Sequence, residues 1–257
     1  MLNRLKIGGL GRIRRIRWRL VDFVNPSHPF LTEDATRINE ARQQHLDLFK
    51  TVIDEKTVLE VGAGIGLFSE KVANRAKSML VTEGRSPLVR ILRKRLKNFH
   101  NVSVLKVDVE NPKDIKRLCE SGKYDLLLCY GLLYHLSNPK EFLRRFSPLT
   151  KNLILETVVD FSSENWITIK ENPRTNQAIH LGCRPNPNWL LEEMKKYFNY
   201  VYVCRVVPNH PDFLWELTSR NPTSTSRMIF VCSNDSIFED SPLVAPYIDM
   251  PYSTTFA

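Results

Sequence analysis

Short apolar runs alternate with stretches of helical spacing through the middle of the chain. Five runs have the length of strands: 58–61, 78–82, 102–107, 124–130 and 152–157. The stretches between them carry apolar residues at helical intervals: 66–75, 87–98, 112–120 and 139–147. A helix after each strand returns the chain to the same end of the sheet, so successive strands pair in parallel. The pattern predicts an α/β domain whose mostly parallel sheet is covered by helices on both faces. A polar helical segment over about 32–49 is predicted as a lead-in before the first strand.

The regular alternation ends after residue 157. A polar segment rich in Asn and Pro follows, and we interpret it as an insertion after the fifth strand. A helix over 188–198 and strands over 200–207 and 227–232 are predicted beyond it. The connection 208–226 is long for a compact domain, which favours a lid or a wall of a binding site.

Composition narrows the class of protein. The chain has 257 residues, of which 42% are hydrophobic and 25% charged, proportions that are typical of globular proteins. No apolar run reaches the roughly 18 residues of a membrane-spanning helix. The five cysteines are scattered and form no CxxC pair, so we expect neither a disulfide framework nor a metal site, and a reducing, cytoplasmic location.

Positive charge is concentrated at the N-terminus. The net charge is +9, and the residues before Asp22 include Arg and Lys but no acid. Because apolar residues lie between these cations, the leader 1–31 can form an amphipathic helix that binds an anionic membrane surface or nucleic acid. A solvated helix packed against the domain is the alternative. No continuous apolar stretch follows the charges, which disfavours a secretory signal.

A glycine-rich turn follows the first predicted strand. Gly62, Gly64 and Gly66 alternate there, and the next residues begin a helix. Glycine permits a tight turn and close approach of a ligand, while the start of a helix offers N–H groups to a carboxylate or phosphate. A dinucleotide fingerprint would place its third glycine at Leu67, so NAD is disfavoured. Glu83, about 20 residues further on, ends the second strand, where a carboxylate can accept hydrogen bonds from ribose hydroxyls.

The segment Glu60-Val-Gly-Ala-Gly-Ile-Gly66, followed by Glu83, resembles the first motif of the class I S-adenosylmethionine-dependent methyltransferases. The resemblance implies a Rossmann-like sheet of seven mostly parallel strands, the last of them antiparallel, and S-adenosylmethionine as the cofactor. It also implies a division of the domain 32–257 into a cofactor-binding half, an acceptor-pocket half with the final strands, and an irregular tail: 50–157, 158–234 and 235–257.

The same resemblance assigns the cofactor residues. Glu60 would orient the glycine turn near the methionine part of the cofactor, and Asp108 would contact adenine, with Val109 beside it. The other residues expected at the cofactor lie in the turn, at the end of the second strand and at the end of the fourth: Gly62, Ala63, Gly64, Gly66, Glu83, Gly84 and Tyr130.

The segment 130–139 after the fourth strand resembles that of small-molecule methyltransferases of the ubiquinone-biosynthesis type and of a relative that modifies tRNA wobble uridine. This resemblance favours a small-molecule acceptor, with RNA as the alternative. The Asn/Asp-Pro-Pro-Tyr/Phe signature of amino-methylating enzymes is absent, so N-methylation of a base is disfavoured.

A hydroxyl acceptor would need a general base, and three residues are candidates: Tyr134, His135 and His180. Arg184 is a candidate to bind an anionic substrate, and Trp166 to form a wall of the acceptor site. Structural roles remain open for all five. An oxidoreductase and a non-catalytic adaptor that binds a membrane or nucleic acid through the leader also remain open, and so does the oligomeric state.

Overall fold

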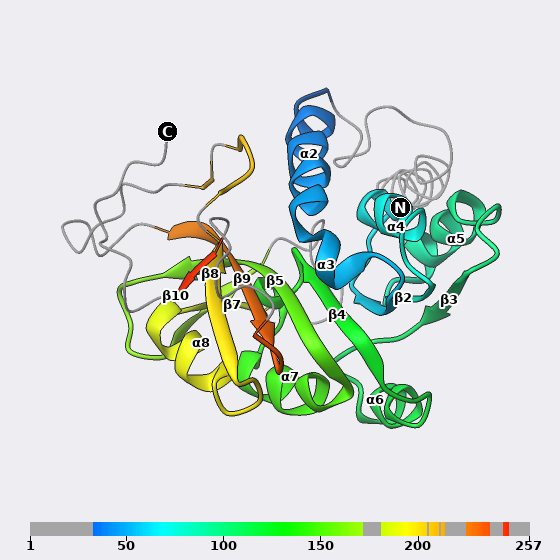
Figure 1. Cartoon of the computed structure of the whole chain (residues 1–257). Coiled ribbons are helices and arrows are strands. Elements are labelled where there is room, and N and C mark those ends of the chain that lie inside the picture. Colours follow the sequence, from blue (N-terminus) through cyan, green and yellow to red (C-terminus); the bar gives the residue numbers. More distant parts are fainter. Residues whose placement is uncertain are drawn as a thin grey trace, which may run out of the picture.

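The computed structural model describes residues 33–171, 181–204, 206–210, 212–213, 225–236 and 244–246 (Figure 1). The leader 1–31, the candidate base His180 and most of the predicted lid lie outside the described residues. Among the described helices, none is long and apolar enough to cross a membrane.

A single large sheet forms the centre of the molecule. Its strand order is β10-β8-β9-β5-β4-β1-β2-β3. The strands are β1 (Thr57–Val61), β2 (Ser78–Glu83), β3 (Val102–Lys106), β4 (Tyr124–Tyr130), β5 (Thr150–Asp160), β8 (Tyr200–Cys204), β9 (Thr225–Ser233) and β10 (Val244–Pro246). β1 to β5 pair in parallel, whereas β9 is antiparallel to both β5 and β8.

The predicted Rossmann-like sheet of seven strands with an antiparallel last strand is therefore confirmed. The three-residue strand β10 adds an eighth strand at the edge, paired with β8. It falls within 235–257, so the prediction that this tail is irregular throughout is wrong.

The central strands are buried on both faces, which is why they read as continuous apolar runs rather than as alternating ones. Along β1, Val58 belongs to the hydrophobic cluster on one side of the sheet and Leu59 to the cluster on the other. Along β4, Leu126 and Leu128 face the first cluster and Leu127 the second, and all three are fully buried. This packing fixes the register, because a shift of one residue would exchange the two faces.

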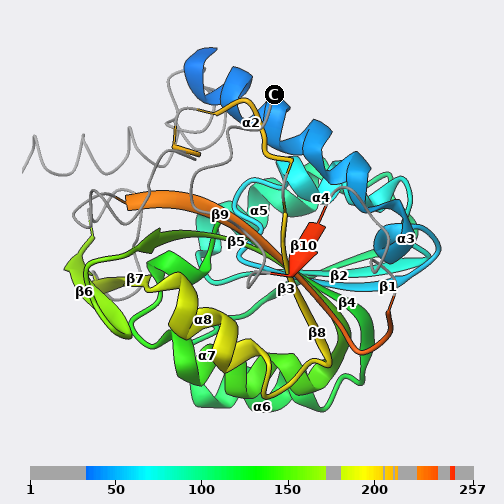
Figure 2. The ribbon, with the colours of Figure 1, turned by 60° about the vertical axis from the view of Figure 1, so that its left-hand side comes forward.

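Helices cover both faces of the sheet (Figure 2). One face carries α2 (Glu33–His45), η1 (Leu46–Phe49), α3 (Lys50–Ile53), α4 (Leu67–Ala73) and α5 (Ser86–Arg95). The other carries α6 (Pro112–Cys119), α7 (Pro139–Phe146) and α8 (Pro187–Met194), with the short turns η2 (Leu133–His135) and η3 (Ser147–Leu149) nearby in the chain.

The sequence specifies the starts of α6, α7 and α8 by a repeated Asn-Pro pair. Asn111, Asn138 and Asn186 each precede the helix, and each side chain accepts a hydrogen bond from a backbone N–H of the first turn. Proline then occupies the first helical position, where its missing N–H costs nothing.

The polar insertion after β5 forms a two-stranded antiparallel hairpin, β6 (Trp166–Lys170) and β7 (Leu181–Pro185). The hairpin packs against η2: the Cys183 thiol donates to the Leu133 carbonyl at 3.3 Å, and a Cβ on Gly182 would come within 2.5 Å of the Tyr134 carbonyl. This contact brings β7 next to the residues after β4.

Candidate active site

The carboxyl ends of β1, β2, β3 and β4 open into a cleft made of two adjoining cavities. The β2–β3 cavity has a volume of about 320 Å³ and is lined mainly by Glu83 to Pro87, Val107 to Glu110 and Leu136. The glycine-turn cavity has a volume of about 100 Å³ and is lined by residues of α2, the turn after β1 and the segment after β4. Gly62, Arg85, Leu132 and His135 line both. The cleft lies where ligands bind in open α/β sheets.

The turn after β1 requires its glycines. Gly62, Gly64 and Gly66 have φ values of +70°, +60° and +84°. A Cβ on Gly62 would lie 2.7 Å from a methyl group of Leu132, and one on Gly66 would lie 2.7 Å from Leu92. The Gly66 N–H donates to the Ala63 carbonyl at 2.9 Å, which closes the turn just before α4. Close packing therefore fixes this backbone against the segment that follows β4.

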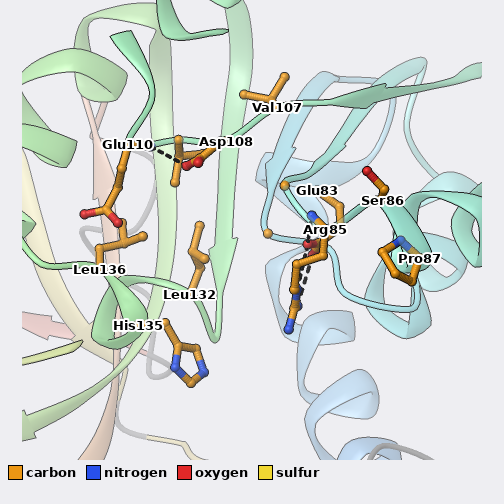
Figure 3. A pocket seen from close by; sticks show the side chains of 13 residues that line it. Glu83, Arg85, Ser86, Pro87, Val107, Asp108, Glu110, Leu132, His135 and Leu136 are labelled. Atoms are coloured by element: carbon orange, nitrogen blue, oxygen red, sulfur yellow. Dashed lines mark hydrogen bonds and ion pairs between the residues drawn. The ribbon is translucent and has the colours of Figure 1, made fainter. Parts of the chain in front are cut away.

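Glu83 is 3% exposed and its carboxylate receives four N–H donors. Oε2 accepts from the Gly64 backbone at 2.9 Å and from Arg85 Nη2 at 3.2 Å. Oε1 accepts from the Arg85 backbone and from Arg85 Nε, both at 2.8 Å. Glu83 thus joins the end of β2 to the glycine turn. The side chain of Arg85 lies beside the carboxylate of Glu83 (Figure 3).

Two acidic side chains after β3, Asp108 and Glu110, line the β2–β3 cavity and bind backbone groups around it (Figure 3). Asp108 Oδ1 accepts from the Glu110 backbone at 3.0 Å. Glu110 Oε1 in turn accepts from the Ser137 backbone at 2.9 Å and from its hydroxyl at 2.7 Å. These bonds tie the end of β3 to the segment after β4, so the two walls of the cavity have a fixed separation. Gly84 and Val109 line the same cavity.

Arg42 of α2 is buried beside the glycine turn. Its Nη1 donates to Asn39 at 3.1 Å and its Nη2 to Glu156 at 2.6 Å, and its guanidinium lies 4.7 Å from the ring centre of Phe68 and 5.2 Å from that of Tyr130. Arg42 Nε is buried and has no hydrogen-bond partner among the described residues. Arg42 and Asn39 line the glycine-turn cavity, so residues that precede the predicted cofactor-binding half 50–157 also face this cavity.

Glu156 of β5 is fully buried between two arginines. Arg227 Nη1 donates to Glu156 Oε1 at 2.7 Å, opposite Arg42. Burial alone would raise the pKa of Glu156, but the charges of Arg42 and Arg227 outweigh it and lower that pKa. Arg227 Nη2 also donates to the Tyr134 hydroxyl at 3.3 Å. This network holds α2, β5, β9 and η2 together behind the glycine-turn cavity.

His135 lies where the two cavities meet. Its Nδ1 is 3.1 Å from Glu171 Oε2, and Arg184 donates to the other oxygen of Glu171 at 3.2 and 3.3 Å. A carboxylate only accepts, so Nδ1 carries the proton and Nε2 holds the lone pair of the neutral ring. Burial lowers the pKa of His135 to about 4, although Glu171 opposes this shift. The imidazole is therefore neutral near pH 7 and can accept a proton.

Two residues predicted at the acceptor lie outside both cavities, and their roles toward a substrate stay predictions. Arg184 lines neither cavity, and its guanidinium is used by Glu171 and by the carbonyls of Tyr134 and Cys183. Its guanidinium thus holds the carboxylate of Glu171 in place. Trp166 also lines neither cavity, because it packs against Trp189 with ring centres 5.0 Å apart.

The other predicted residues divide between the cavities and the wall behind them. Tyr134, Tyr130, Ala63 and Gly64 line the glycine-turn cavity. Gly66 and Glu60 line neither: Gly66 is the N-cap of α4, and Glu60 is 2% exposed beneath the turn. The described residues contain no cluster of three His, Cys, Asp or Glu side chains that could hold a metal ion.

Sequence reasoning missed five charged residues of the site: Arg42, Arg85, Glu156, Glu171 and Arg227. Arg85 could have been found, since it follows Glu83 by two positions and both are charged. The other four come from segments that only the fold brings together, and no local pattern marks them.

S-adenosylmethionine fits the residues of this cleft. Arg42 Nε is buried and has no hydrogen-bond partner among the described residues, and the acid Glu60, two positions before the glycine turn, is 2% exposed and lines neither cavity. An ammonium group and a carboxylate on one ligand would complement them. Glu83 is a carboxylate that can accept hydrogen bonds from a ribose, and the β2–β3 cavity has room for an adenine ring.

Comparison with known proteins supports the same cofactor. A family model, ribosomal RNA adenine dimethylase, matches residues 30–139. The chain is similar to ribosomal RNA small subunit methyltransferase A of Pediococcus pentosaceus, with 29% identity over 161 residues that cover 60% of this chain and 52% of the relative. It is also similar to a ubiquinone biosynthesis O-methyltransferase of Acinetobacter baumannii, with 27% identity over 117 residues, 45% of this chain and 48% of that one. The chain spans between about a third and about half of the length of the curated relatives it matches.

Solved structures share the fold. The N-terminal domain of EvdMO1 with SAH bound superimposes with a TM-score of 0.63 at 20% identity, covering 79% of this chain and 84% of that one. The DhpI–SAH complex superimposes with a TM-score of 0.52 at 14% identity, covering 84% and 93%. With the sheet order and the glycine turn, these matches confirm the class predicted from the sequence: the chain has the Rossmann-like fold of the class I S-adenosylmethionine-dependent methyltransferases, and S-adenosylmethionine is the cofactor of that class.

Proposed function

We propose that the chain transfers the methyl group of S-adenosylmethionine to an oxygen atom of its acceptor. The observation that carries this proposal is the position of His135, a neutral imidazole held by Glu171 where the two cavities meet. An oxygen acceptor must lose a proton during transfer, and a neutral histidine at the reacting atoms can take it.

In this proposal, each part of the cleft holds one part of the cofactor. Arg42 and Glu60 attract the carboxylate and ammonium groups of the methionine part, Glu83 binds the ribose, and Asp108 and Val109 contact the adenine. When bound, the sulfonium supplies an activated methyl group, so the protein needs mainly to position the acceptor and exclude water.

The residues around His135 would support proton transfer from a hydroxyl. Nε2 takes the proton, Glu171 stabilises the imidazolium that forms, and Arg184 holds Glu171 in place. Because burial keeps the pKa of His135 near 4, the proton is readily passed on to water after transfer. The reaction should therefore continue at a pH well below the usual histidine range of about 6.5.

RNA is the first acceptor class that we propose, ahead of the small molecule favoured by sequence. The match to ribosomal RNA adenine dimethylases supports it. A basic stretch of the chain that begins at the cleft residue Arg85 supports it too: residues 84–107 contain seven Arg and Lys and no acid, and Arg93 and Lys97 of this stretch are exposed. The segment after β4 lacks the signature for exocyclic amines, which favours an oxygen over the amino group of adenine.

A small molecule with a hydroxyl group is the second candidate, supported by the match to a ubiquinone biosynthesis O-methyltransferase. The basic residues of 84–107 provide a test that distinguishes the two acceptor classes. Replacing Arg93 and Lys97 together by Glu should abolish methylation of RNA and leave methylation of a small molecule unchanged, because only a polyanion needs these charges.

The test is release of S-adenosylhomocysteine with pooled RNA and with pooled metabolites as acceptors. His135→Asn should lower turnover by about 10²- to 10⁴-fold with nearly unchanged affinity for S-adenosylhomocysteine. Loss of affinity or of folding in proportion to the loss of turnover would make His135 structural. Turnover on an amine that His135→Asn leaves intact would contradict the oxygen acceptor.

A further inference from the structure

The carboxylate of Glu83 has no acceptor position left for a ribose. A carboxylate offers about four lone-pair sites. Two of those on Glu83 are filled by backbone N–H groups, from Gly64 and Arg85, and two by the Arg85 side chain, through Nε and Nη2. A ribose that binds Glu83 with both hydroxyls therefore needs two of these four donors to leave.

The two backbone donors are part of the fold and cannot leave. Gly64 lies in the turn, whose conformation is fixed by its close packing, and the Arg85 N–H belongs to the chain between β2 and α5. The two side-chain donors can leave by a change of rotamer, because the side chain of Arg85 is 21% exposed and lines the cleft. Their removal would free two lone pairs, one on each oxygen, which is the number that two ribose hydroxyls require.

The position of Arg85 agrees with this count. Arg85 lines both cavities, together with Gly62, Leu132 and His135. Figure 3 shows its side chain beside Glu83, on the side of the cleft opposite His135. A long cationic side chain in this place occupies space between the two cavities that a continuous cofactor has to cross.

We infer that Arg85 occupies the ribose position of the cofactor-free protein and is displaced from Glu83 when S-adenosylmethionine binds. This inference rests on the cofactor assignment of the proposed function. Arg85 keeps the buried charge of Glu83 paired in the absence of ligand, and the ribose hydroxyls replace its donors in the complex. Arg85 is thus a positioning residue that weakens the binding of substrate and of product alike, and so aids release of S-adenosylhomocysteine.

The experiment measures ligand affinity by calorimetry for wild type and for Arg85→Met, which keeps the length of the side chain and removes its donors and charge. Affinity for S-adenosylhomocysteine and for adenosine should rise about three- to tenfold, the effect of losing a competing, partly exposed ion pair. Affinity for 2′,3′-dideoxyadenosine should stay unchanged, because this ligand lacks both hydroxyls.

Two further variants locate the effect. Arg90→Met removes an exposed charge from α5, the helix that follows Arg85, and should not change affinity, which controls for net charge. When Glu83 is already replaced by Ala, Arg85→Met should not raise ligand affinity, because the carboxylate for which Arg85 and the ribose compete is absent. Thermal unfolding without ligand establishes that each variant is folded.

Weaker binding of S-adenosylhomocysteine to folded Arg85→Met would overturn the inference and make Arg85 a direct cofactor contact. An equal gain for dideoxyadenosine, or a gain that persists without Glu83, would overturn it as well. A wild type that binds neither S-adenosylhomocysteine nor adenosine would instead refute the cofactor assignment itself.

Discussion

Glu60 carries an acid group in a place that disfavours its charge. It is 2% exposed, and burial, reinforced by the negative charge of Glu83, raises its pKa to about 7. Because this pKa is higher in the folded than in the unfolded chain, Glu60 favours folding most strongly at a pH below its ordinary value of 4.5, and this contribution is lost as the pH rises through about 7. Near pH 7 the carboxyl group of Glu60 is therefore only partly ionised, and a cation bound next to it would favour its ionised form.

Cofactor affinity should depend on the ionisation of Glu60. The ammonium group of S-adenosylhomocysteine is attracted by the carboxylate and not by the neutral acid, so we expect affinity to rise between about pH 6 and pH 8. Calorimetry at both pH values measures this. Glu60→Gln, which is neutral throughout, should abolish the pH dependence, and an unchanged dependence in that variant would assign it to another group.

Gly64 offers space for a side chain but not for a negative charge. A Cβ there would meet nothing within 4 Å, although its φ of +60° strains any residue other than glycine. Gly64→Asp should abolish binding of S-adenosylhomocysteine, because its carboxylate would face the carboxylate of the ligand. Gly64→Ala is the matched control with similar strain, about 1 kcal/mol, and should keep most of the affinity. Binding by a folded Gly64→Asp protein would mean that the site lies elsewhere.

Among the elements, α2 is the one whose role differs from the sequence prediction. The sequence indicates only a polar helix that leads into the fold, whereas the structure places its Asn39 and Arg42 at the glycine-turn cavity. The helix is held there by the ion pair of Arg42 with Glu156 of β5. Gly131 makes room for this pair, since a Cβ on it would lie 2.9 Å from Arg42 Nη2. The glycine-turn cavity is therefore complete only when α2 is docked.

Arg42→Gln should lower both stability and cofactor affinity. Glu156 keeps Arg227 as a partner, so we expect a loss of about 1–3 kcal/mol in the free energy of unfolding, measured with urea. Affinity for S-adenosylhomocysteine should fall at least about tenfold, as for a lost charge-assisted bond. Affinity for adenosine, which has no carboxylate, should stay near wild type. An equal loss for both ligands would show that Arg42 acts only through the fold.

At the scale of the whole molecule, two halves of the chain meet at His135. The residues that line the cavities belong to the first half, α2 to the segment after β4, while the Glu171–Arg184 pair that holds His135 comes from the insertion after β5. The insertion thus contributes to the site from outside the repeated βα units, and the division into a cofactor half and an acceptor half stays a prediction. His180 and most of 208–226 lie outside the described residues, and their roles at the site stay predictions.

The basic leader 1–31 also stays a prediction. Its removal should leave affinity for S-adenosylhomocysteine unchanged, because the turn, Glu83 and Arg42 all follow it in the chain. If the leader binds an anionic partner, the truncated protein should lose retention on RNA or sedimentation with anionic vesicles, and salt should weaken the same binding in the full chain. Unfolding of the truncated protein would instead make the leader structural.

The sequence by itself determined the features that depend on neighbours along the chain. The alternation of apolar runs and helical stretches specified the sheet, the Asn-Pro pairs specified where three helices begin, and the glycines with Glu83 specified the cofactor class. Each of these signals is local, since a turn, a cap or a strand end is built from residues a few positions apart. The glycine turn can therefore be assigned to a cofactor from the amino-acid sequence alone.

Only the tertiary structure decided which distant side chains complete the site. Arg42, Glu156 and Arg227 lie in three different elements, and their buried charges pair because packing of α2 and β9 on β5 brings them together. Arg184 looked equally suited to a substrate until the hairpin placed it against Glu171. A long charged side chain can reach many different partners when only the sequence is known. Once it is buried away from water, it must pair with the charged or polar groups that the fold places next to it. The local pattern therefore predicted the cofactor site, and the packing of distant elements defined the surroundings of the proposed base.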